Sequence, residues 1–211
     1  MTDLGTLGGT QSQAWGISAS GQVVGSASLA GDTGTRAFLW SNGNMVSLGT
    51  LGAGTFSTAW DISNAGHITG WSATNGNADF HAFLHSDGML LDLGTLGGSR
   101  SIGYGVNNLR QVVGVSSNSA TDFSGRAFLH SDGNMHDLND LLHQDVGAGW
   151  YLYEARAIND TGQIVGIGSF NGIQRAFLLN PISEVSEPGS FALVAAALLL
   201  IRVAQRRQHV I

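Results

Sequence analysis

The sequence contains no cysteine and no lysine, and only two of its 211 residues are proline. The absence of cysteine excludes disulfides, thiolate metal sites and a cysteine nucleophile. Charged residues are also sparse, at 11%, whereas hydrophobic residues reach 43%. A disordered chain has the opposite balance, so this composition predicts a packed fold.

Positive charge is scarce outside the C-terminal end. All nine basic residues are arginines, and three of them lie within the last ten positions. Residues 1–180 carry six arginines against thirteen Asp and Glu, a formal charge of −7. Such a field repels a phosphate backbone, and we therefore expect no nucleic-acid partner.

Glycine is abundant, with 31 residues that follow no collagen-like period, and this indicates many tight turns. The chain is also repetitive. Leu-Gly-Thr-Leu-Gly begins at Leu4, Leu48 and Leu93, and decays to Leu-Asn-Asp-Leu at Leu138. Three other markers recur in constant order: Arg/His-Ala-Phe-Leu from Arg36, His81, Arg126 and Arg175, a Val-Val-Gly relative ending at Gly25, Gly70, Gly114 and Gly166, and Ile17, Ile62, Val106 and Ile158. These markers define four repeats of about 45 residues.

Each repeat predicts four short antiparallel strands, which in the first repeat cover residues 14–18, 22–28, 36–40 and 45–51. Asn-Gly at 42–43 and Asp-Gly at 87–88 and 132–133 separate the third and fourth strands. These dipeptides favour type I′ hairpins, because both central residues of that turn need a positive φ.

Four strands in about 45 residues are typical of a propeller blade, so we predict an all-β fold with a four-repeat, propeller-like domain over residues 1–181. A β-solenoid is the alternative, although its coils are usually shorter. The fourth repeat lacks its last strand, and residues 2–7 duplicate that strand. We predict that residues 2–7 pair with residues 175–179 and close the ring, which removes a free sheet edge. Pairing only with residues 14–28 would instead indicate an open array.

A family resemblance rests on three strings: Asp-Leu-Gly-Thr-Leu-Gly-Gly, Gly-Gln-Val-Val-Gly and Arg-Ala-Phe-Leu-Trp. Over residues 3–180 the chain resembles the HAF family of bacterial extracellular repeats, whose His-Ala-Phe string begins here at His81. The resemblance implies an exported protein and brings no established activity. Arg110, where the sister turns have glycine, departs from the pattern.

The C-terminal end changes character after residue 181. Residues 182–190 are polar and acidic, and residues 191–211 form a short apolar run followed by a basic end. This order resembles a PEP-CTERM sorting signal of Gram-negative bacteria, with a degenerate motif that lacks its first proline. The motif consists of Ser186, Glu187, Pro188 and Gly189, the apolar membrane helix includes Phe191, Ala192, Leu193, Val194, Leu198, Leu199, Leu200 and Ile201, and the basic stop consists of Arg202, Arg206 and Arg207.

The resemblance implies that an exosortase-type sorting enzyme is a partner and that the tail enters the membrane. It further implies an inner-membrane anchor before processing, and then a place in the cell envelope or extracellular matrix. Spanning a bilayer takes about 20 apolar residues, so residues 190–204 would all be needed. An amphipathic or buried helix packed on the domain is the alternative. Export also needs an N-terminal signal, which residues 1–7 do not supply, so we expect the natural start upstream of Met1.

Trp150, Tyr151 and Tyr153 make the most aromatic stretch of the chain, and we predict that they form an exposed ligand patch. Trp15, Trp60 and Tyr104 share one repeat position. We interpret them as an aromatic layer between blades, with stacking on sugar rings as the alternative.

No constellation in the sequence indicates catalysis, a cofactor or a metal. His85 and His130 occupy the repeat position of Trp40 and Leu179, which favours a large, partly buried side chain over a metal ligand. His136, Asp137, His143 and Asp145 lie near the extra residues of the fourth repeat, and we interpret them as solvated. The loop residues Asp32, Asp79 and Asp122 do not reproduce a calcium loop.

The sequence therefore favours a non-catalytic, exported repeat protein with a structural or interaction role. A carbohydrate-binding module for extracellular polysaccharide is the second hypothesis. A propeller hydrolase is the third, because two carboxylates can meet in a propeller channel, although no pair stands out.

Overall fold

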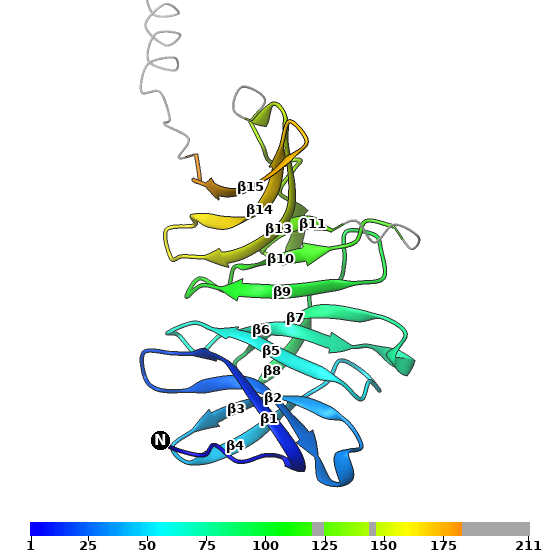
Figure 1. The fold of residues 1–211 in the computed structure, drawn as a ribbon, viewed down its shortest axis with the longest axis vertical. Coiled ribbons are helices and arrows are strands. Elements are labelled where there is room, and N and C mark those ends of the chain that lie inside the picture. Colours follow the sequence, from blue (N-terminus) through cyan, green and yellow to red (C-terminus); the bar gives the residue numbers. More distant parts are fainter. Residues whose placement is uncertain (120–124, 144–146, 183–211) are drawn as a thin grey trace, which may run out of the picture. The chain divides into compact units, whose positions relative to one another are not determined.

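A computed structural model describes residues 1–119, 125–143 and 147–182 (Figure 1). The chain divides into two units after Asn180. Within the described part of the first unit, the strands form four antiparallel sheets, and each sheet coincides with one repeat. The prediction of an all-β repeat fold is therefore confirmed.

Strand order within every sheet follows the order of the sequence. The first sheet comprises β1 (Gly8–Ile17), β2 (Val23–Leu29), β3 (Thr35–Ser41) and β4 (Asn44–Gly49). The second comprises β5 (Ser57–Ile62), β6 (Ile68–Ala73), β7 (Phe80–Ser86) and β8 (Met89–Asp92). The third comprises β9 (Ser101–Val106), β10 (Val112–Ser116), β11 (Arg126–Ser131) and β12 (Asn134–Asp137), and the fourth β13 (Trp150–Ile158), β14 (Ile164–Phe170) and β15 (Ile173–Leu179). Two short 3-10 turns, η1 (Ala30–Asp32) and η2 (Asn75–Asn77), lie in the loops between second and third strands.

The hairpins between third and fourth strands have the predicted turn geometry. Asn42 and Gly43 have φ angles of 50° and 83°, and the Asp-Gly turns at 87–88 and 132–133 repeat this pair of positive angles. Asn171 and Gly172 form a fourth turn of this kind, but between β14 and β15, where the other repeats have a longer loop.

Each first strand carries a bulge opposite the glycine that ends the Val-Val-Gly marker. A Cβ at Gly25 would overlap the carbonyl oxygen of Gln13, and the equivalent atom at Gly70 would overlap that of Thr58. This close backbone approach explains why the marker ends in glycine in every repeat.

The sheets pack against one another in sequence order. β5 contacts the first three strands of the first sheet, β9 those of the second, and β13 those of the third. Apolar side chains fill these interfaces, as with Val24, Ala37, Ala59 and Ile62 between the first two sheets. Each core is thus shared by two neighbouring repeats, as in other repeat proteins.

The predicted ring closure is wrong. Residues 2–7 do not pair with β15; Leu7 forms an isolated bridge with Leu29, inside its own repeat. No extensive contact joins the first sheet to the last among the described residues, because each sheet packs on its sequence neighbours and two sheets lie between these two. Residues 1–119, 125–143 and 147–182 form no closed propeller, and their four sheets make an open array. The predicted C-terminal membrane helix lies outside the described residues.

Candidate ligand-binding site

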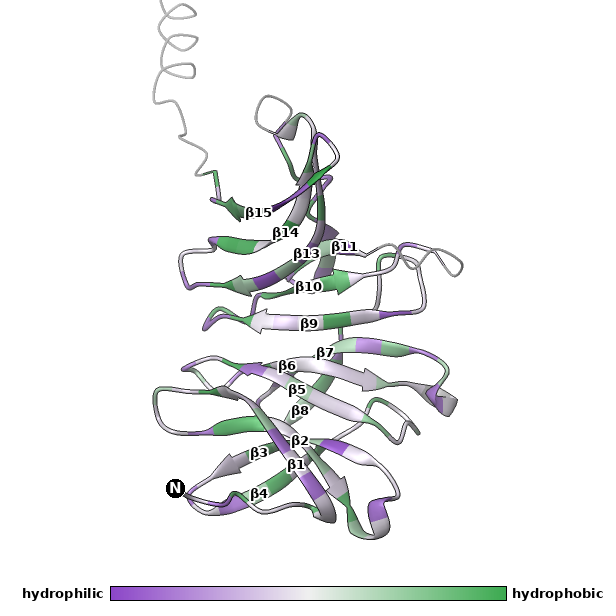
Figure 2. Ribbon diagram, viewed as in Figure 1, coloured by the Kyte–Doolittle hydropathy of each residue, from purple (hydrophilic) through white to green (hydrophobic). Residues whose placement is uncertain are grey.

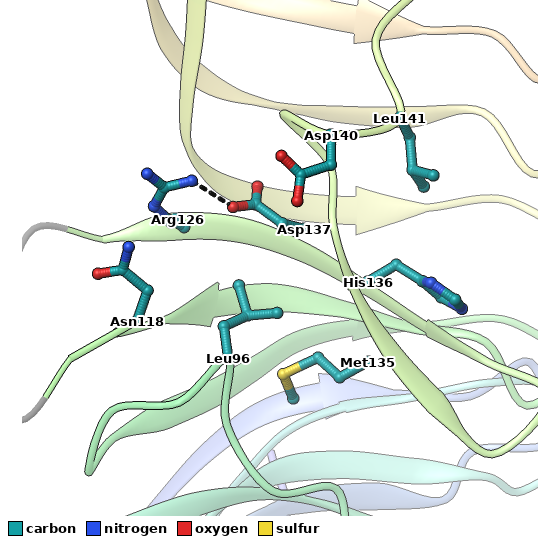
Figure 3. A pocket seen from close by; sticks show the side chains of 8 residues that line it. All are labelled: Leu96, Asn118, Arg126, Met135, His136, Asp137, Asp140 and Leu141. Carbon is teal, nitrogen blue, oxygen red and sulfur yellow. Dashed lines mark hydrogen bonds and ion pairs between the residues drawn. The ribbon is translucent and has the colours of Figure 1, made fainter.

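The pocket of interest lies beside the third and fourth strands of the third repeat and has a volume of about 430 Å³ (Figure 3). Its lining combines a guanidinium, two carboxylates, an amide, an imidazole and three apolar side chains: Arg126, Asp137, Asp140, Asn118, His136, Leu96, Met135 and Leu141.

An ion pair between Arg126 and Asp137 forms one wall. Arg126 Nη1 lies 2.6 Å from Asp137 Oδ2, and the Asp137 side chain is only 8% exposed. The other carboxylate oxygen accepts hydrogen bonds from the backbone and side-chain nitrogens of Asn139, both at 2.8 Å. Both oxygens of Asp137 are therefore engaged in structural bonds, which does not suit a free catalytic base.

The guanidinium keeps its charge and retains unused donor capacity. The hydrogen bond to Asp137 raises the pKa of Arg126. Its Nε is buried and has no hydrogen-bond partner among the described residues. Because a buried donor without an acceptor is costly, this atom is a candidate for satisfaction by a bound ligand or water.

The same pairing occurs one repeat earlier. His81 Nδ1 lies 3.0 Å from Asp92, at the positions equivalent to Arg126 and Asp137. The hydrogen bond to Asp92 raises the pKa of His81. Burial opposes ionisation of Asp92, but hydrogen bonds from His81 and Gly94 outweigh it and lower its pKa. In the second and third repeats a cation on the third strand thus faces a carboxylate on the fourth, whereas the first repeat has Ser47 at the carboxylate position.

Two of the three predicted patch residues lie beside this ion pair. The Arg126 guanidinium stands 5.6 Å from the ring centre of Tyr151, and the rings of Tyr151 and Tyr153 are 5.1 Å apart. Tyr153 is 38% exposed. Trp150 instead contacts Phe170, with 5.3 Å between ring centres, and packs against the core shared by the third and fourth sheets. The predicted patch is therefore divided, and the tyrosines form one site with Arg126 and Asp137, here called the Arg–Tyr site.

The sequence indicates Tyr151 and Tyr153 of the Arg–Tyr site but shows Arg126 only as a repeat marker. The expectation that Asp137 is solvated is wrong, because its side chain is 8% exposed and pairs with Arg126. A constant spacing was the available signal. The sequence places His81 and Arg126 eleven residues before Asp92 and Asp137.

Three other candidate residues form a ladder between sheets. The ring centres of Trp15 and Trp60 are 4.6 Å apart, and those of Trp60 and Tyr104 are 6.0 Å apart. Arg156, the fourth residue at this repeat position, places its guanidinium 4.4 Å from the Tyr104 ring centre. These rings contact one another across repeats in tilted and edge-on arrangements, which agrees with the interpretation as an aromatic layer.

The histidine positions also have a structural explanation. His130 is buried and His85 is half-buried, and burial lowers the pKa of both. Within residues 1–119, 125–143 and 147–182, no group of three or more His, Cys, Asp or Glu could hold a metal ion.

The remaining candidates lie in loops or outside the description. Asp32 accepts hydrogen bonds from the backbone nitrogen and hydroxyl of Thr10, each at 3.0 Å, and so ties its loop to β1. Asp79 and His143 also occupy loops. Asp122, Asp145 and the sorting segment, residues 186–207, lie outside the described residues. In the part of the chain that is described, no helix is long and apolar enough to cross a membrane.

Neither a scan against protein-family models nor a search of curated proteins found a match to this chain.

Proposed function

We propose that the chain is a non-catalytic, exported repeat protein that binds extracellular polysaccharide through the Arg–Tyr site. The juxtaposition that carries the proposal is Tyr153, Tyr151 and Arg126 in consecutive contact beside a polar pocket. Exposed aromatic rings suit the apolar faces of sugars, and an array of fixed charged and amide groups suits their hydroxyls.

The absence of catalysis is part of the proposal. Asp137 is bound on both oxygens, so among the described lining residues Asp140 is the carboxylate left for acid or base chemistry. Glycoside hydrolysis generally requires two functional carboxyl groups. We therefore expect binding without turnover.

Export and anchoring belong to the same proposal and rest on the sequence. The HAF-like repeats and the PEP-CTERM-like tail favour a protein handled by an exosortase-type enzyme and held at the envelope or matrix of a Gram-negative bacterium. Deleting residues 191–211 should convert a membrane-bound product into a soluble one. Identical fractionation of the two forms would contradict the anchoring.

Binding is tested by titrating the full chain with bacterial exopolysaccharide fractions. Tyr153→Ala should lower the affinity about tenfold, which corresponds to about 1.4 kcal/mol. Trp15→Ala is the matched control, because Trp15 is an exposed aromatic residue, 49% accessible, in a different sheet. Equal loss in both variants, or no binding by the wild type, would contradict the proposed site.

A further inference from the structure

The outer face of the fourth sheet is built from positions that are buried or half-buried in every other repeat. Val24, Thr69 and Val113 are 0% exposed, whereas their equivalent Val165 is 43% exposed. The neighbouring leucine position shows the same trend: Leu84 is 6% exposed and Leu39 and Leu129 are half-buried, whereas their equivalent Leu178 is 57% exposed. In the first three repeats the following sheet covers these positions. Figure 2 shows hydrophobic segments in β14 and β15.

The outer face of the first sheet exposes positions that, in the second and third repeats, are buried against the preceding sheet. Ile62 and Val106 are 5% and 4% exposed against the preceding sheet, whereas their equivalent Ile17 is 69% exposed. Ala59 is fully buried, and its equivalent Ala14 is exposed. The two outer faces are therefore the two halves of the interface that occurs three times inside the chain.

The N-terminal segment already has the conformation of a connection between repeats. Ser57 donates a hydrogen bond to the carbonyl of Gly49 at 2.6 Å, and Ser12 donates likewise to Gly5 at 2.7 Å. Ser57 also accepts a hydrogen bond from Ala37 in the preceding sheet. Thus Gly5 and Ser12 share the contact that joins the end of one sheet to the first strand of the next.

Residues 2–7 duplicate the strand that is missing along the free edge of β15. In the third repeat Phe128 pairs with Asp137 of the fourth strand, and in the second repeat Phe83 pairs with Asp92. The same register would place Asp3 opposite Phe177. It would also supply a carboxylate to Arg175, the equivalent of Arg126 and His81, which forms no ion pair within the described residues.

We propose that the chain associates head to tail with a second copy of itself. The outer face of the fourth sheet of one copy, with Val165 and Leu178, covers the outer face of the first sheet of the next copy, with Ala14 and Ile17. Residues 2–7 of that next copy supply the fourth strand along β15. The contact is heterologous, so it generates either a closed ring or an open filament of copies. It uses neither the pocket nor the tyrosines, and it stands independently of polysaccharide binding.

The test uses two full-length variants with one face disrupted in each. Leu178→Glu breaks the fourth-sheet face, and Ile17→Glu breaks the first-sheet face; both residues are exposed, so each monomer should fold. Sedimentation in a mild detergent should show concentration-dependent association for the wild type. Each variant alone should associate at least about tenfold more weakly. An equimolar mixture should form a dimer that does not grow, because one intact face remains on each copy.

Leu109→Glu is the matched control, since Leu109 is 65% exposed in a turn of the third repeat and lies on neither face; it should associate like the wild type. Association driven by residues 191–211 would leave all variants unchanged and would overturn the proposal. A monomeric wild type, or variants whose mixture does not restore a dimer, would overturn it as well.

A charge reversal tests the strand exchange itself. Arg175→Glu should weaken association, and Asp3→Arg should do the same. The chain carrying both substitutions should regain most of the wild-type association, because the two charges then meet with exchanged signs. Failure of the double variant to recover would contradict the pairing of Asp3 with Arg175.

Discussion

Val113 and Val165 occupy the same position in the third and fourth repeats, yet the first is fully buried and the second is 43% exposed. Their strands pair alike, and each valine precedes the glycine of the same marker. The difference arises because a following sheet covers β10, whereas no sheet of the described residues follows β14 and covers it. The repeat sequence thus specifies an apolar sheet face, and the presence of a neighbouring repeat determines how much the burial of that face contributes to stability.

The largest expected contrast comes from placing a carboxylate at this position in both repeats. Val113→Asp buries an uncompensated charge and should lower the free energy of unfolding by roughly 3–5 kcal/mol. Val165→Asp, on the outer face, should change it by less than about 0.5 kcal/mol. Urea unfolding at micromolar concentration measures both. Similar losses in the two variants would show that the fourth sheet is covered within the monomer.

The arginines of the third and fourth repeats give a second contrast. Arg126→Ala leaves the buried carboxylate of Asp137 without its cation and should destabilise the fold by roughly 1–3 kcal/mol. Arg175→Ala, at the equivalent position without a fourth strand, should be nearly neutral in the monomer. Thermal unfolding of dilute samples provides the comparison, and a neutral Arg126→Ala would contradict the structural role of that ion pair.

A smaller contrast concerns how pH changes the stability contributed by the His81–Asp92 pair of the second repeat and by the Arg126–Asp137 pair of the third. Because the pKa of His81 is raised in the folded state, its stabilising contribution is complete below its unfolded pKa and is lost as the pH rises through the folded value. The lowered pKa of Asp92 makes the carboxylate's contribution present above its own unfolded pKa and lost in acid. The pair should therefore stabilise the protein most near pH 5–6, by at most about 1 kcal/mol given its exposure.

The measurement is the free energy of unfolding of wild type and His81→Gln at pH 5.5 and pH 8.5. The difference between the two proteins should shrink at the higher pH. For Arg126→Gln the difference from wild type should stay constant over this interval, because arginine does not titrate there. A constant difference for His81→Gln would refute the pH dependence.

The smallest expected effect concerns the turn between first and second strands. Arg110 has a φ of 65°, whereas its equivalents Gly21, Gly66 and Gly162 have φ between 78° and 85°. A left-handed conformation strains arginine, so Arg110→Gly should raise the free energy of unfolding by about 0.5 kcal/mol after the entropy of glycine is deducted. The ion pair with Asp87 is exposed on both sides and offsets little of this. A destabilised variant would contradict this assignment of strain.

The parts of the fold that were predictable from sequence depend on local chemistry. The Asn-Gly and Asp-Gly turns and the strand pattern indicated four-stranded units, because turn geometry and pairing act over a few residues. Closure was not predictable in this way. It depends on the rotation between successive sheets, which arises from side-chain packing across each interface and leaves no separate motif.

The residues of the candidate site likewise differ in whether local sequence could predict them. An aromatic run indicated Tyr151 and Tyr153, but alternation along β13 sends Trp150 to the core, against Phe170. The contact of Tyr151 with Arg126 joins two repeats, so neither segment alone could reveal it.

The central claim is that the exposed first and last sheets are the two halves of one interface. Because the chain has no cysteine, Thr2→Cys combined with Leu178→Cys introduces the only two thiols. In the register of the other repeats these positions face each other between copies, as Leu91 faces Leu84 within the second repeat. Mild oxidation followed by non-reducing electrophoresis should give a ladder of covalent multimers. A monomer with an internal disulfide would contradict the account, because it would show that the ring closes within one chain.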